Sequence, residues 1–118
     1  MFPPIYSTLR ASSAVVAIVG DRIGAFGEIH QDESRPYVTH QIIAGLPENQ
    51  LSDVPDTDLM QIQLNCYHAT EAGVQTLVES VRDAIEPVAH VTGYPVVQRE
   101  SATRLYVVAI QVDWWLNR

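Results

Sequence analysis

The 118-residue chain contains no lysine, a single cysteine and no long hydrophobic run, and each absence excludes a class of protein. The apolar stretch at residues 14–19 stops at Gly20 and Asp21, far short of the ~20 residues that a membrane span needs. The N-terminus lacks a basic region followed by an apolar core, so no secretory signal is expected. A lone cysteine forms no internal disulfide. Cys66 lies in an alternating apolar pattern and is predicted to be a small buried hydrophobe in a reducing compartment.

The missing lysine leaves seven arginines against fourteen carboxylates, a formal net charge of −7. Nucleic-acid binders need a clustered basic patch, because binding gains free energy from the release of counterions. The arginines here are scattered along the whole chain. Tight binding of DNA or RNA is therefore not expected, although DNA could pass along such a surface without sticking to it.

Residue patterns that signal catalysis or metal binding are also missing. None of the four histidines forms an i, i+4 pair with a carboxylate between, and no second cysteine accompanies them. There is no Gly-x-Ser-x-Gly and no phosphate-binding loop. Cys66 and His68 share a strand face, but Cys66 continues an apolar row and no strained turn exposes its sulfur. We therefore expect no catalytic, cofactor or metal site and no enzymatic activity.

What the chain does contain is the pattern of one α+β domain, residues 1–118. A short helix follows Pro4, and Ser12 or Ser13 can cap a second helix over residues 14–19, which Gly20 closes. A longer amphipathic helix begins after Thr70, with Glu71 at the positive end of its dipole. Its apolar residues recur at spacings of three and four up to Pro87: Val74, Leu77, Val78, Val81 and Ile85.

Alternating apolar and polar residues predict the strands. They are expected at residues 22–29, 37–44, 58–67, 96–99 and 105–115, with a turn at residues 92–95 and a long polar loop at residues 45–58. The order of helices and strands predicts an α+β fold: a mostly antiparallel sheet of four to five strands, with two main helices packed on one face.

The C-terminal strand is apolar on both faces. Tyr106, Val108, Ile110, Val112 and Trp114 alternate with Leu105, Val107 and Ala109, and polar residues soften the second face only at Gln111 and Asp113. One face can pack on the chain's own helices. We expect the other to meet a further layer or a second subunit, because large exposed apolar patches are rare on soluble monomers.

Two further features are candidate interaction sites. The loop at residues 45–58 gathers Glu48, Asp53, Asp56 and Asp58; it is either a solvated acidic loop or one that projects its charge into a channel or towards a partner. Trp114 and Trp115 must face opposite ways on a strand, so at most one belongs to the main core. Either both pack against the sheet and helices, or one is an interface anchor.

Segments along nearly the whole chain, in the same order, resemble the tail completion (tail terminator) proteins of long-tailed bacteriophages and prophages. They are residues 4–11, 19–23, 35–38, 61–67, 71–85 and 104–114. No single motif is specific; the similarity lies in the ensemble.

The resemblance implies a structural virion protein that closes into a hexameric ring with copies of itself on the head-proximal end of the tail tube. Its partners would be the tail tube protein and the head–tail connector, its place the virion tail, and its site of assembly the host cytoplasm. Two alternatives stay open: a neck or head-closure subunit of the same virion, or a small α+β enzyme or ligand-binding domain with His40, His68 or the acidic loop lining a pocket.

Overall fold

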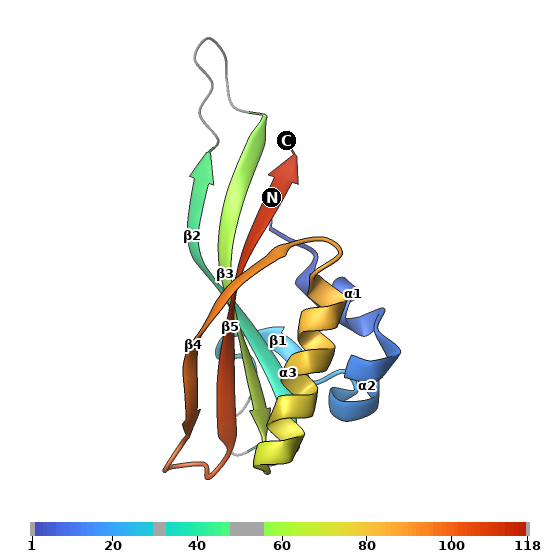
Figure 1. Ribbon diagram of the computed structural model, residues 1–118, viewed down its shortest axis with the longest axis vertical. Coiled ribbons are helices and arrows are strands. Elements are labelled where there is room, and N and C mark those ends of the chain that lie inside the picture. Colours follow the sequence, from blue (N-terminus) through green and yellow to red (C-terminus); the bar gives the residue numbers. More distant parts are fainter. Residues whose placement is uncertain (1, 30–32, 48–55, 118) are drawn as a thin grey trace.

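The computed structural model describes residues 2–29, 33–47 and 56–117, which form three helices and a five-stranded sheet (Figure 1). In chain order the elements are α1 (Ile5–Arg10), α2 (Ser13–Val19), β1 (Ile23–Ala25), β2 (Tyr37–Pro47), β3 (Thr57–His68), α3 (Glu71–Ile85), β4 (His90–Arg99) and β5 (Tyr106–Asn117). The strands are ordered β1-β2-β3-β5-β4. The short β1 pairs in parallel with β2, and the other neighbouring strands pair antiparallel. The predicted fold class is confirmed.

The helices begin and end where their capping residues predict. The Ser12 hydroxyl accepts a hydrogen bond from the Val15 N–H at 3.4 Å, and Gly20 ends α2 with a positive φ of 59°. The Thr70 hydroxyl accepts a bond from the Gly73 N–H at 3.0 Å. These bonds satisfy backbone donors that the first turn of a helix leaves free.

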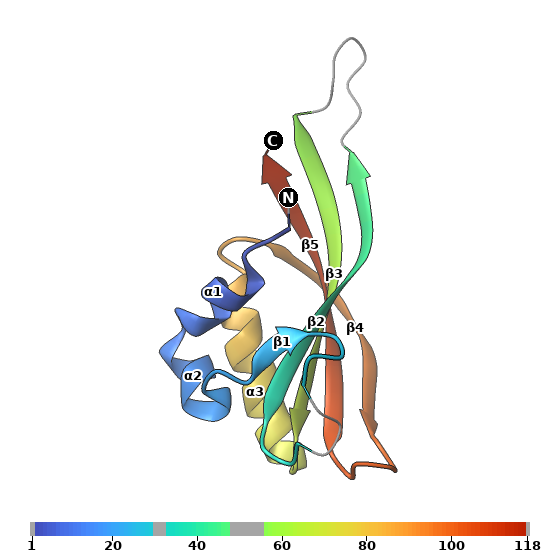
Figure 2. The same ribbon diagram turned by 180° about the vertical axis from the view of Figure 1, so that it is seen from behind.

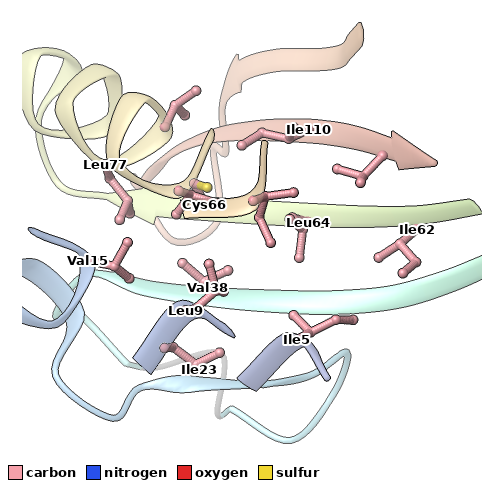
Figure 3. Close-up of a cluster of buried hydrophobic side chains, with 14 of the residues drawn as sticks. Ile5, Leu9, Val15, Ile23, Val38, Ile62, Leu64, Cys66, Leu77 and Ile110 are labelled. Carbon is pink, nitrogen blue, oxygen red and sulfur yellow. The ribbon is translucent and has the colours of Figure 1, made fainter. Parts of the chain in front are cut away.

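All three helices lie on one face of the sheet, and β2, β3 and β5 extend beyond them at one end (Figure 1 and Figure 2). The core fills the space between helices and sheet. It includes Leu9 and Val15 from the N-terminal helices, and Figure 3 shows Leu77 of α3 above the row of β3 side chains. The apolar row of β3 and the first row of β5 face this layer: Met60, Ile62, Leu64, Cys66, Val108, Ile110, Val112 and Trp114.

The loop predicted at residues 45–58 begins too early, whereas the strand predicted from Asp58 is confirmed to within one residue, since β3 begins at Thr57. Residues 45–47 continue β2 and pair with residues 58–60, so Asp58 lies in β3 opposite Pro47. A register shift between Ile42 and Ala44 breaks the alternation that would have revealed the longer strand. Glu48 and Asp53 lie outside the described residues.

The turn predicted at residues 92–95 is also wrong, because these residues are part of β4. The pairing of β4 with β5 shifts register on either side of Gly93, and these shifts leave the extra residues of β4 without a partner on β5. Pro95 is tolerated because β4 is an edge strand, where a missing N–H need not break a ladder bond.

Candidate assembly surfaces

The second face of β5 is covered by the chain itself. Val107 lies in register between Tyr67 of β3 and Gln98 of β4, and Ala109 lies between Asn65 and Val96. The larger neighbouring side chains leave Val107 only 4% exposed and Ala109 fully buried. Leu105, just before the strand, is buried too. The expectation that a second subunit must cover these residues is therefore wrong, because the chain already buries them.

Trp114 and Trp115 point to opposite faces of the sheet, as adjacent residues of a strand do. Trp114 is 5% exposed and belongs to the core beneath the helices, whereas Trp115 is 46% exposed on the opposite face. Trp115 pairs in register with Leu59, at the end of the sheet that extends beyond the helices. Only one of the two rings therefore belongs to the main core, as predicted, and an interface role for Trp115 stays a prediction.

The middle of this helix-free face is polar but nearly uncharged. Gln41, Gln63 and Gln111 stand side by side across β2, β3 and β5. The Gln63 amide donates to the Asn65 side-chain oxygen at 2.9 Å. Asp113 is a charged exception, and its buried Oδ1 has no hydrogen-bond partner in the described part of the chain. Such a surface offers amide groups for hydrogen bonding and little charge for attracting or repelling DNA.

At one end of this face, the rings of Tyr37 and Tyr67 stack with centroids 4.3 Å apart. Burial is the largest cause that raises the pKa of Tyr37, to about 12, and it also raises the pKa of Tyr67. Both phenols therefore stay neutral at physiological pH. The stack supports the sheet and gives no sign of acid–base chemistry.

The acidic loop is described only at its C-terminal end. Asp56 is exposed, and Asp58 is half-buried in β3 opposite Leu116 of β5. Both lie beyond the helices, at the same end of the sheet as Trp115. The structure therefore places Asp56, Asp58 and Trp115 at one end of the molecule.

The chemically reactive side chains are dispersed. Cys66 is fully buried, and desolvation raises the pKa of its thiol to about 12, which keeps the sulfur protonated. The ring of His68 accepts a hydrogen bond at Nδ1 from the Thr70 N–H, 3.2 Å away, at the start of α3. Among the described residues, no three His, Cys, Asp or Glu side chains are placed to hold a metal ion.

Of the proposed ligand-binding residues, His40 lies in a groove. The groove is open and mostly apolar, lined also by Phe2, Ile5, Phe26 and Ile42. Burial is the main cause that lowers the pKa of His40, so the imidazole is neutral at physiological pH. No helix in the described ranges is long and apolar enough to cross a membrane.

Comparisons with known proteins identify a family that the chain matches and a solved structure with a similar fold. The family model described as "Tail completion protein gp17" matches residues 3–117. No curated protein matches the chain. Among solved structures, a chain from the "Virion of native gene transfer agent (GTA) particle" is similar with a TM-score of 0.72 and 13% sequence identity, over 97% of this chain and 92% of that one. At this identity the likeness establishes the fold alone.

Proposed function

We propose that this chain, which belongs to the tail completion protein gp17 family, forms a ring that caps the head-proximal end of a phage tail tube. Membership of the family makes it a structural tail protein, and this single observation carries the proposal. The ring contains six copies, stops polymerisation of the tail tube protein and presents a surface to the head–tail connector. The protein assembles in the host cytoplasm and stays in the virion tail.

The charges of the chain suit such a position. DNA must move through the ring without binding, and binding would need clustered cations to displace counterions. The chain offers twice as many carboxylates as arginines, and the centre of its helix-free sheet face presents amides. The function needs contact surfaces and a passage, and no reaction is required of the protein.

Removing the gene from a phage that carries it is the direct test. We expect tails of uncontrolled length that lack heads, visible by electron microscopy, because nothing then ends the tube. Supplying the chain from a plasmid should restore tails of one length joined to heads. Native mass spectrometry of rings released from tails should give about six times the 13.1 kDa mass of one chain. Tails of normal length joined to heads without the protein would refute the proposal.

The acidic loop is proposed to face the lumen or an adjoining ring. Changing Asp53, Asp56 and Asp58 together to asparagine should then reduce head joining about tenfold, the effect of losing ~1.4 kcal/mol of interfacial electrostatic energy. Joining can be measured by mixing purified tails that carry the variant with purified heads and counting infectious particles.

A control for this variant removes three carboxylates elsewhere: Asp21→Asn, Glu79→Gln and Asp83→Asn, all exposed and near or on the helices. It should leave ring assembly and joining unchanged. If the loop variant also behaves like the unaltered chain in both measurements, the loop has no role in assembly.

A further inference from the structure

The exposed apolar side chains gather at the two opposite edges of the sheet. Ten large hydrophobic residues are exposed in the described part of the chain, and eight of them fall into two groups. The β2-edge patch consists of Ile42, Ile43 and Leu46 of β2 with Phe2 and Phe26, which share a groove with Ile42. The β4-edge patch consists of Tyr94 and Val97 of β4 with Val88 just before it. Two unlike patches on opposite edges suit a head-to-tail contact.

The outer edge of β2 has backbone groups free to pair with a further strand, and so has β4 on either side of Pro95, which has no N–H to donate. Within the described residues, β1 covers β2 only at residues 38–40, so the outer edge of β2 from residue 41 to residue 47 has no neighbouring strand. The outer edge of β4 has none either. Monomeric proteins usually protect such an edge with charged side chains, yet β2 contains no charged residue. The apolar, uncharged outer edge of β2 is therefore suited to pairing with a further strand.

The distribution of charge favours a second copy as the occupant. Two chains of net charge −7 repel each other wherever their carboxylates meet. β2 and β4 contain no carboxylate among their 11 and 10 residues, and the charge on β4 is that of Arg99 at its end, with His90 at its start. Copies of this acidic chain can therefore approach each other through these two edges at little electrostatic cost.

The strand directions agree with this contact. Because β2, β3, β5 and β4 pair antiparallel in succession, β2 and β4 run in opposite directions. Two copies placed side by side in the same orientation therefore bring β4 of one antiparallel to β2 of the next. Val97 lies level with Val38 and Ile42 lies level with Val91, so Val97 meets Ile42 when the copies are offset by four residues along the strands. We propose that the β2-edge patch of each copy packs on the β4-edge patch of its neighbour, so that one sheet continues from copy to copy. The closing of this contact into a ring rests on the proposed function.

Cysteine cross-linking can test the contact, because the native Cys66 is buried and its thiol is protonated. Ile42 pairs with Ile62, and Val97 pairs with Val108; both partners lie in the core, so the two side chains point to the helix-covered side of the sheet. Ile42→Cys and Val97→Cys are made separately, mixed, and treated with a short bis-maleimide, both in concentrated solution and on isolated tail tubes. We expect cross-linked dimers from the mixture and none from either variant alone.

The matched control replaces Ile42→Cys with Ala17→Cys, at an exposed position on α2. Mixed with Val97→Cys, it should give no dimer. Equal yields from control and test mixtures, or dimers from Ile42→Cys alone, would overturn head-to-tail pairing, the latter in favour of a two-fold contact.

A mixture that gives no dimer in solution or on tubes, while Cys66 resists labelling as expected of folded chains, also overturns the edge contact. Tail length separates this failure from that of the proposed function. If no cross-link forms but the tails still end at one length, the edge contact is refuted and the proposed capping function stands. If the cross-link forms but the tails do not end at one length, the edge contact is supported and the proposed capping function is refuted.

Discussion

Replacing Trp114 with alanine is expected to lower the free energy of unfolding by about 3–5 kcal/mol. The indole is 5% exposed and packs in the core beneath the helices, so its removal loses buried apolar area and leaves a cavity. Domains of this size have a total stability of about 5–15 kcal/mol, so the variant should be close to unfolding at 37 °C. Urea denaturation followed by circular dichroism measures the change.

Trp115→Ala is the matched control, since it removes the same side chain one residue away on the opposite face. We expect its free energy of unfolding to change by about 1 kcal/mol or less, because nearly half of the ring is exposed. As the proposed interface anchor, it should instead weaken assembly on tail tubes about thirtyfold, the size of a hot-spot loss of ~2 kcal/mol. Equal destabilisation of the two variants would contradict the placement of the rings, and normal assembly of Trp115→Ala would remove its interface role.

Gly73→Ala is expected to destabilise the chain by up to about 1 kcal/mol, the reverse of what an alanine usually does in a helix. Alanine normally stabilises a helix interior by ~1 kcal/mol relative to glycine. At this position, however, a Cβ atom would collide with the ring of His68. The ring cannot move away without losing its hydrogen bond from the Thr70 N–H. Thermal unfolding would detect the loss as a lower Tm.

A double-mutant cycle isolates the collision. In a His68→Ala background the space above Gly73 is open, so Gly73→Ala should become neutral or stabilising. The sign of the Gly73→Ala effect should therefore change between the two backgrounds. If Gly73→Ala stabilises the unaltered chain, the close packing of His68 on α3 is wrong.

Predictions from the sequence are correct where neighbouring residues alone decide the structure. Thr70 and Ser12 cap their helices because a side-chain oxygen close to a free N–H depends only on neighbouring residues. The apolar row of α3 and that of β3 both face the core, because each follows the period of its element. The same periodicity placed Cys66 in the core and so identified it as an inert thiol.

The errors lie where long-range pairing overrides local composition. Gly45 and Pro47 resemble loop residues, yet they extend β2 because β3 supplies pairing partners. Gly93 and Pro95 resemble a turn, yet β5 holds them in an edge strand through two register shifts. Val107 and Ala109 look as if they need a partner subunit, although the folded chain already buries them. In each case the deciding contact comes from a distant part of the chain.

The candidate surfaces were only partly visible in the sequence. The alternation around Trp114 and Trp115 showed that they must separate, but which ring enters the core depends on where the helices pack. The edge patches gave no sequence signal, since Ile42 and Val97 look like ordinary strand residues. They became recognisable once the strand order placed β2 and β4 at or near opposite edges of the sheet.

The sequence alone determined the α+β class, the helix caps and the inert cysteine, because each depends on composition or on neighbouring residues. Only the tertiary structure decided the strand order, the true length of β2 and β4, and which apolar side chains stay exposed. Those properties depend on which strands lie next to each other, and that pairing joins residues far apart in the chain.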